Sequence, residues 1–164
     1  MNPKYPLEEI AQIKQRRLEE AEKQLKEKKE ALRQEEERLK EAEQKRDAVK
    51  KRRDQKIAKF LQDIEMGTSS EKITQHKRYM KEVIDIELQQ ENDNVLKQKK
   101  VVEQAEKELE IAKKEYYRRH IETEKMQLHR KEWEKEARAE LLRIENLEKY
   151  EIGTHIHKRN QDGG

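Results

Sequence analysis

Between Leu7 and Ile152 the chain contains no proline and one glycine, Gly67, which lies in the short run MGTSS at residues 66–70. Proline and glycine are the residues that most strongly interrupt helices, so the tracts on both sides of Gly67 are free to be helical. A lone breaker between two long helix-forming tracts predicts an α-helical hairpin with one turn. Such a protein has no pocket, so its function must lie in the proteins that it contacts.

Composition excludes a conventional globular core. Charged residues make up 47% of the 164 residues, aromatic residues 4%, and the mean hydropathy is -1.46. This composition with helical periodicity is typical of a coiled coil. The 40 basic and 37 acidic residues leave a net charge of only +3, unlike a polybasic nucleic-acid tail. The chain lacks cysteine, a signal peptide and any apolar run near the roughly 20 residues of a membrane span. We therefore predict a soluble cytoplasmic protein without membrane insertion.

The first helix, predicted at about 6–66, carries a heptad pattern. Leucine recurs every seven residues, at Leu18, Leu25, Leu32 and Leu39. A companion row runs beside it, at Ala21, Lys28, Glu35, Ala42 and Val49. Two such rows form the a and d positions of a two-stranded coiled coil. Nearer the turn the apolar positions shift, as in a stutter, to Ile57, Phe60 or Leu61, and Ile64.

The turn at 67–70 combines a helix stop with a helix start. Gly67 can adopt the left-handed conformation that ends a helix. Thr68, followed by Glu71 three residues later, predicts a capping box that satisfies free amides at the start of the next helix. These residues are expected to reverse the chain.

The second helix is predicted at about 71–152, and a flexible tail at 153–164. Its seam is marked by Ile84, Leu88, Val95, Val102, Ala105, Leu109, Ala112, Tyr116, Thr123, Met126, Trp133, Ala137, Ile144 and Leu147. We therefore predict an all-α fold, a long antiparallel two-helix coiled-coil hairpin with a longer C-terminal helix. The hairpin forms a single domain over residues 1–164.

Charge blocks identify the partner of the seam as the same chain. If the chain folds at Gly67, residues whose numbers sum to about 137 face each other in an antiparallel coiled coil. Lys28 then lies near the acidic stretch at Glu108, and the basic stretch Lys45–Lys59 meets the acidic stretch Glu82–Asp93. A parallel homodimer would set each block against itself. Exposed pairs contribute only about 0–1 kcal/mol each, but flanking charges select orientation and register.

The two helices are unequal, so part of the second has no intrachain partner. In this register residue 7 faces about residue 130, which leaves Lys131–Ile152 uncovered. This overhang still carries an apolar stripe, and an unpaired apolar stripe often binds another protein. Its candidate interaction residues are Trp133, Leu141, Leu142, Ile144, Leu147 and Tyr150. The alternatives are that the overhang frays or pairs with itself in a weak dimer.

A second candidate contact site lies near the turn. His76, Tyr79, Met80 and Val83 follow helical spacing in a chain that is poor in aromatic residues. This spacing usually indicates a core, here one that faces Phe60. Because two helices cannot cover all four side chains, we expect one face to be exposed for a partner.

Nothing in the sequence indicates catalysis or a cofactor. No nucleophile motif or phosphate-binding loop surrounds any glycine, so we predict that the protein is not an enzyme. His155 and His157, with His120 and His129 upstream, do not make a convincing metal site, and no metal is predicted. The basic stretch Lys45–Lys59 is interpreted as the partner of the acidic stretch, and no nucleic-acid binding is expected.

The chain resembles the YscO/FliJ family, and more closely its YscO branch. These are the central stalk proteins of type III secretion and flagellar export ATPases. The resemblance rests on the opening Pro6-Leu7-Glu8-Glu9, the row of leucines from Leu18 to Leu39, the turn at 66–70 and the overhang Trp133–Tyr150. It covers nearly the whole chain, but it is architectural, because the family has no catalytic motif to match.

The resemblance implies a non-enzymatic accessory protein of a type III secretion system. In that role the chain would be the central stalk of the hexameric secretion ATPase and an escort for secretion chaperones. Its expected partners are that ATPase, an export-gate protein and the chaperones. It would be a cytoplasmic monomer or weak homodimer, peripheral to the inner-membrane secretion apparatus. The alternative function is a structural coiled-coil spacer or scaffold that dimerises through its C-terminal helix.

Overall fold

The computed structural model describes residues 3–163, and Met1, Asn2 and Gly164 of the predicted domain lie outside the described residues. Helix α1 spans Glu8–Glu65, α2 spans Ser70–Tyr79, a π-helical turn η1 spans Met80–Ile84, and α3 spans Asp85–Asp162. No strand occurs between residues 3 and 163. The predicted fold class is confirmed, because the fold is all-α and hairpin-like.

The chain forms two compact units. The hairpin unit, Lys23–Lys114, contains most of α1, the turn, α2, η1 and the first part of α3. The terminal unit consists of Met1–Glu22 together with Glu115–Gly164, and it holds the start of α1 and the rest of α3. Each unit buries its own section of the seam between the helices.

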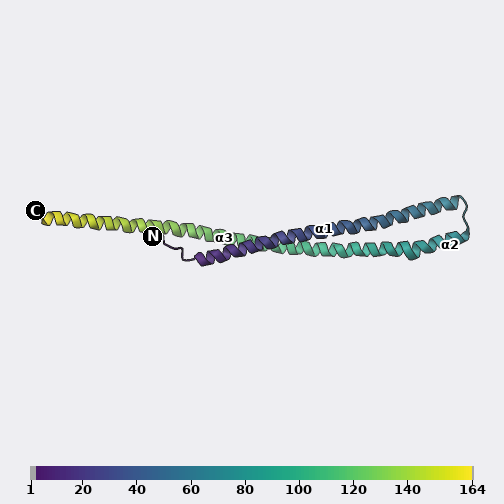
Figure 1. Ribbon diagram of the computed structural model, residues 1–164, viewed down its shortest axis with the longest axis horizontal. Helices are drawn as coiled ribbons and strands as arrows, with labels where there is room; N and C mark the ends of the chain where they lie inside the picture. The colour runs from purple at the N-terminus through teal and green to yellow at the C-terminus, as the bar shows by residue number, and fades with distance from the viewer. Residues whose placement is uncertain (1–2, 164) are drawn as a thin grey trace. The chain divides into compact units, whose positions relative to one another are not determined.

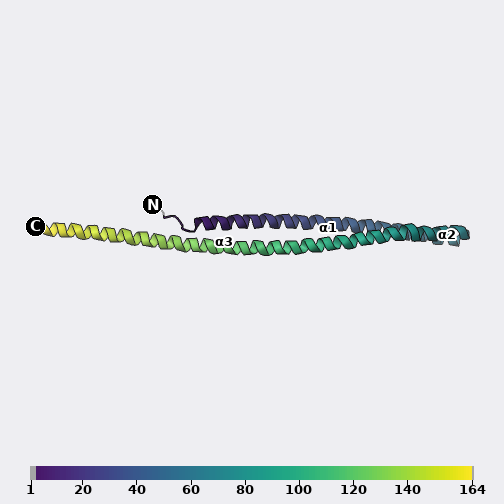
Figure 2. The same cartoon turned by 90° about the horizontal axis from the view of Figure 1, so that it is seen from below.

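In the hairpin unit α1 runs antiparallel to α2 and α3, to which the turn joins it (Figure 1, Figure 2). Most side chains predicted for the seam have reduced exposure, but the assignment of Ile64, next to the turn, was wrong, because it is 43% exposed. Val49, Ile84, Val95, Val102 and Ala112 are buried. The leucines of the α1 heptad row lie half-buried between them. The heptad pattern therefore identified the face on which the helices meet.

Cross-helix contacts confirm the antiparallel register. Lys28 Nζ lies 3.2 Å from Glu108 Oε2, Arg53 Nε lies 3.3 Å from Asp85 Oδ1, and Arg52 pairs with Glu87. The residue numbers in these pairs sum to 136, 138 and 139, close to the predicted value. The last two pairs also confirm that the basic stretch near the turn meets the acidic stretch of the second helix.

The turn ends one helix as predicted and begins the next differently. Gly67 has φ +85°, in the left-handed region, and its amide donates to the Ile64 carbonyl at 3.1 Å. The capping box predicted at Thr68 and Glu71 was wrong, because Ser69 is the N-cap and its hydroxyl accepts from the Lys72 amide at 3.3 Å. Ser69 is extended (φ -71°, ψ 151°), so the chain uses one more residue to reverse direction before α2 begins.

The π-helical turn η1 was not predicted. The Asp85 amide donates to the Met80 carbonyl, five residues earlier, which adds one residue to this turn of the helix. The half-buried or buried seam positions here are His76, Met80, Ile84 and Leu88, four residues apart each time. A regular heptad alternates spacings of three and four, so η1 accommodates one extra residue and keeps the rest of α3 in register.

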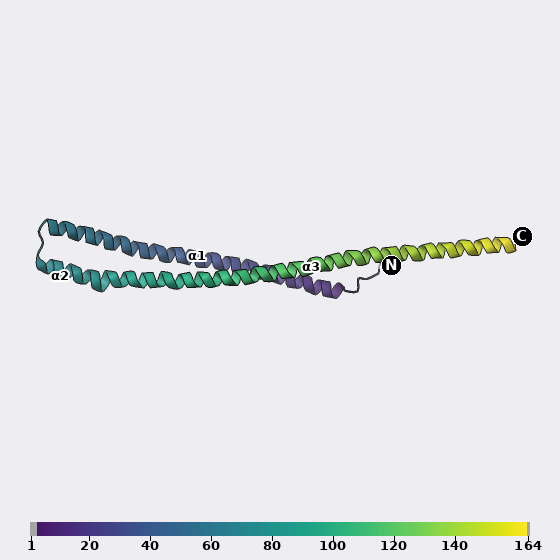
Figure 3. The ribbon, with the colours of Figure 1, turned by 180° about the vertical axis from the view of Figure 1, so that it is seen from behind.

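In the terminal unit α1 begins beside α3, and α3 continues toward the C-terminus (Figure 3). The predicted helix end near residue 152 was wrong, because α3 extends to Asp162 and includes the segment expected to be a tail. A single interior glycine, Gly153, costs a formed helix only about 1 kcal/mol relative to alanine, which does not suffice to end it. Thr154 sits beyond the glycine and donates its hydroxyl to the Tyr150 carbonyl at 2.8 Å.

Candidate protein-interaction surfaces

The segment before α1 is anchored on α3 by Tyr5, which is only 8% exposed. The Tyr5 hydroxyl lies 2.5 Å from His129 Nδ1 and 3.3 Å from the Met126 sulfur. Its ring meets the Trp133 ring edge-on, with 5.4 Å between centroids, and Arg130 lies over it at 5.1 Å. Tyr5 thus holds the N-terminal segment onto α3 through contacts with half-buried Met126, Arg130 and Trp133 and with exposed His129.

This contact corrects the predicted start of the overhang. Trp133 was assigned to a helix without an intrachain partner, but it is half-buried against Tyr5. Glu8 strengthens the contact by pairing with Arg130. Tyr5 escaped sequence analysis because it stands before the helix between Pro3 and Pro6, outside any heptad pattern. Its proximity to prolines that fix the chain direction was the available signal.

Beyond Trp133 the same face of α3 is apolar and uncovered. Ala137, Leu141 and Ile144 continue the spacing of Met126 and Trp133 along the helix. Leu141 is 40% exposed and Ile144 is 41% exposed. A shallow notch lies where the N-terminal segment ends, lined by Pro3, Tyr5, Glu8, Arg130, Trp133, Glu134, Ala137, Arg138 and Leu141. We call the face formed by Ala137, Leu141, Ile144 and Ile152 the α3 stripe.

The structure does not bring all of the predicted overhang residues to this face. At 3.6 residues per turn, Leu142 lies about 100° and Tyr150 about 180° around α3 from Leu141, and Leu147 lies at the edge, about 120° away. Leu142 is 58% exposed and Tyr150 is 72% exposed. The predicted set therefore divides into side chains that continue the packing face and three, Leu142, Leu147 and Tyr150, that point elsewhere.

Carboxylates lie within and beside the α3 stripe. Glu134, Glu145, Glu148 and Glu151 lie within about 80° of Leu141 around the helix, against Arg138 and Lys149 at the edge of the same face. All four carboxylate side chains are exposed. Glu140, by contrast, binds Arg143 at 2.6 Å, and this hydrogen bond holds the pKa of Glu140 below its ordinary value. The face therefore combines apolar side chains with carboxylates, of which Glu134 and Glu148 lie within the stripe and Glu145 and Glu151 lie at its borders.

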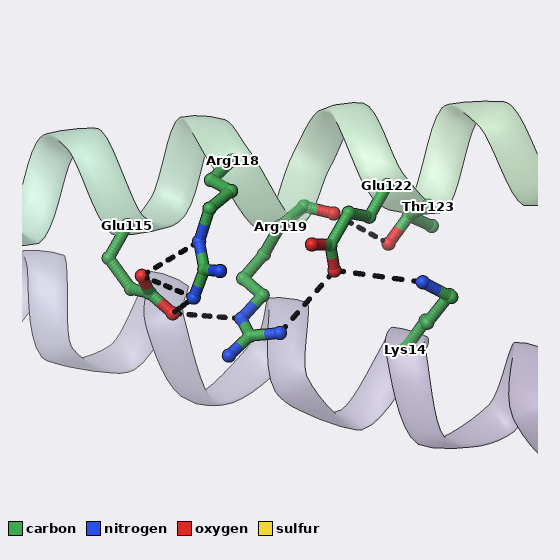
Figure 4. Close-up of polar contacts among 6 residues, drawn as sticks. All are labelled: Lys14, Glu115, Arg118, Arg119, Glu122 and Thr123. Carbon is green, nitrogen blue, oxygen red and sulfur yellow. Dashed lines mark hydrogen bonds and ion pairs between the residues drawn. The ribbon is translucent and has the colours of Figure 1, made fainter.

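A chain of polar contacts in the terminal unit runs from Glu115 through Arg119 and Glu122 to Lys14 of α1 (Figure 4). Glu115 accepts hydrogen bonds from Arg118 and then Arg119, at 2.9 Å and 2.8 Å, and together they lower its pKa. Arg119 also reaches Glu122, which lies 3.7 Å from Lys14 of α1. In this section of the terminal unit a polar contact between the helices lies beside half-buried apolar side chains such as Leu18 and Tyr116.

Near the turn, the second predicted cluster splits between the seam and solvent. The His76 ring stacks on Phe60 with 3.9 Å between centroids, and Met80 is half-buried. Tyr79 is 41% exposed and Val83 is 45% exposed. The extra residue in η1 puts Ile84, instead of Val83, into the seam. We call the exposed pair Tyr79 and Val83, with Lys56 at 6.0 Å from the Tyr79 ring, the apex face.

The described residues contain no group of three or more His, Asp or Glu side chains arranged to hold a metal. His157 Nε2 lies 3.2 Å from Gln161 Nε2 of the same helix. Within residues 3–163, no helix has the length and apolar character needed to cross a bilayer.

Comparisons with known proteins agree with the resemblance seen in the sequence. Residues 2–162 match the model of the YscO-like protein family. The chain is also similar to the solved structure of CT670 from Chlamydia trachomatis, described as a YscO homologue, with 41% sequence identity and a TM-score of 0.91. The match covers 99% of each chain. No curated protein gives a significant match.

Proposed function

The chain belongs to the YscO-like family, which makes it an accessory protein related to type III secretion, and we propose that it is the non-enzymatic central stalk of the hexameric secretion ATPase. In this role it also escorts secretion chaperones and contacts an export-gate protein. It works in the cytoplasm, at the inner-membrane secretion apparatus.

The observation that carries the proposal is the α3 stripe. A stalk must offer its ring a surface that its own chain leaves free, and Leu141 and Ile144 continue the packing face of α3 beyond the contact between Tyr5 and Trp133. The apex face, with Tyr79 and Val83, is a second exposed apolar site in the hairpin unit. We assign the α3 stripe to the ATPase and the apex face to the export gate or a chaperone.

A stalk of two antiparallel helices has a physical means of acting on a ring. Its cross-section has no rotational symmetry, so one copy presents a different face to each subunit of a hexamer. Such a stalk shifts the ring between nucleotide states only if it binds those states with different affinities. The proposal therefore requires a measurable change in ATP turnover as well as binding.

The test measures ATP hydrolysis by the purified secretion ATPase as this chain is added. Turnover should rise and saturate near one chain per hexamer. Leu141→Ala with Ile144→Ala should abolish the rise, whereas Leu142→Ala with Tyr150→Ala removes similar apolar surface from other faces and should preserve it. Unchanged turnover at saturating concentrations, with the chain folded, would reject the stalk role.

The α3 stripe also favours a second candidate function, a coiled-coil spacer or scaffold that dimerises through its C-terminal helix. An exposed apolar face can be covered by a second copy as well as by a different protein. Sedimentation velocity, which measures the oligomeric state of the chain, distinguishes the scaffold from the stalk when it is combined with the ATPase assay. Concentration-dependent dimers without any effect on the ATPase would favour the scaffold, and a monomer that stimulates turnover would favour the stalk.

A further inference from the structure

We infer that the α3 stripe is a docking site for an amphipathic basic helix of another protein, one with a leucine-like apolar face bordered by lysine or arginine. This inference deepens the proposed function, because it specifies the chemistry of the partner at the same surface.

The first argument is continuity with an interface that the chain already makes. In the terminal unit, the inward face of α3 carries Thr123, Met126 and Trp133, all with reduced exposure. Ala137, Leu141 and Ile144 continue this face of α3 beyond the contact between Tyr5 and Trp133. A face that packs against a helix on one side of Trp133 keeps the geometry to pack against a helix on the other side. The occupant is therefore helical.

The second argument is charge. Where α1 covers α3, a base of α1 commonly sits on a carboxylate of α3. Lys14 pairs with Glu122 in the terminal unit, and Lys28 with Glu108 in the hairpin unit. The pair of Glu8 with Arg130, at the start of α1, is the reverse, because here α1 carries the acid and α3 the base. The acidic pattern continues along the stripe at Glu134, Glu145, Glu148 and Glu151. A helix that takes the place of α1 there must therefore supply the basic side chains.

The site has a defined start. Tyr5, Trp133, Ala137 and Leu141 line the notch that ends the N-terminal segment. Glu134 and Arg138 also line the notch, so the partner side chain that fits here has an apolar body against Trp133 and Leu141 and a polar end toward these charges. The partner helix thus begins at the notch and runs along α3 over Ile144 toward Ile152.

The test uses the full chain and three fluorescently labelled model peptides of about 20 residues, long enough to span the stripe. One peptide has a leucine face bordered by lysine, its twin has glutamate in place of lysine, and a third has the first composition in scrambled order. Binding is followed by fluorescence anisotropy at about 0.15 M salt, where long-range attraction is screened. The lysine peptide should bind at least about tenfold more tightly than the other two.

Four double variants locate the site. Leu141→Ala with Ile144→Ala should weaken binding about tenfold or more, whereas Leu142→Ala with Tyr150→Ala should leave it within about twofold. Glu145→Lys with Glu148→Lys should reverse the preference toward the glutamate peptide. Glu132→Lys with Glu136→Lys makes the same change in net charge away from the stripe and should keep the original preference. Circular dichroism confirms that each variant remains helical.

Three results would overturn the inference. They are equal binding of the lysine and glutamate peptides, equal losses from the two alanine double variants, and self-association through the stripe at the assay concentration. No secretion component takes part, so the outcome is separate from the stalk assay. A chain that binds the lysine peptide but leaves the ATPase unchanged would reject the proposed function alone.

Discussion

Replacing Ile84 with alanine is expected to destabilise the hairpin unit more than any equivalent change on an exposed face. Ile84 is 0% exposed, although only two helices surround it. It lies at the end of the π-helical turn, where the seam shifts by one residue, and Arg53 pairs with its neighbour Asp85 across the seam. The variant therefore tests the burial of Ile84, the register between the two helices and the role of η1 together.

The expected loss follows from the burial of Ile84. Isoleucine to alanine removes three carbons, worth about 2–3 kcal/mol at about 0.8 kcal/mol per buried carbon. In closed cores a cavity term raises the cost to as much as about 5 kcal/mol. A two-helix coil is open at its sides, so water can reach the vacated space and the cavity term should be small. We expect Ile84→Ala to lower the free energy of unfolding by about 2–3 kcal/mol.

Ile86→Ala is the matched control. Ile86 is two residues away and 50% exposed, so the same substitution should cost about 1 kcal/mol or less. The gain in helix propensity from isoleucine to alanine is the same at both positions and cancels. Urea unfolding followed by far-UV circular dichroism gives both values. Equal losses for the two variants would refute the seam position assigned to Ile84 and, with it, the shift at η1.

Three further predictions test other parts of the molecule. Deleting Lys81 should restore α-helical geometry across η1 and change the melting temperature little. Deleting Glu103 should instead rotate the following seam by about 100° and lower the melting temperature strongly. Similar melting temperatures for the two deletions would reject the role of η1. Tyr5→Ala should raise the accessibility of Trp133 to acrylamide quenching, and Tyr117→Ala, at an exposed position, should not. The pKa of Glu115 is lower in the folded chain, so its stabilising contribution is complete above the ordinary value near 4.5 and is lost as pH falls through the folded value. Glu115→Gln should flatten that part of the stability curve, and an unchanged pH dependence would contradict the assignment.

Sequence reasoning recovered the features that depend on long repeats. The heptad rows of α1 and the charge blocks recur over many turns, so errors at single positions cancel and the antiparallel register emerges within two residues. Features decided by one residue were missed. Thr68 and Ser69 are both residue types that cap helices, and the structure uses Ser69. The spacing of Met80, Ile84 and Leu88 contained the signal for η1, but it resembles an ordinary apolar cluster until burial is known.

The same division explains the candidate site. The uncovered α3 face could be predicted from the lengths of the two helices. When the first helix is aligned with the apolar pattern of the second, the C-terminal part of that pattern has no partner. The start of that face could not be predicted, because Tyr5 belongs to no repeat. Its ring nevertheless covers Trp133 edge-on, and His129 and Arg130 hold it in place.

The internal interface of the chain also constrains the partner that the chain lacks. α1 holds α3 by apolar side chains in the seam and by bases such as Lys14 and Lys28 placed on α3 carboxylates. Exposed ion pairs contribute little energy, so the apolar seam provides the affinity while the charges select direction and register. Beyond Trp133, α3 retains both parts of this arrangement, with Leu141 and Ile144 on the packing face and carboxylates such as Glu145 and Glu148 on and beside it. A partner that matched only the apolar part could bind in either direction, whereas one that also supplies the bases is held in a single register, as a stalk requires.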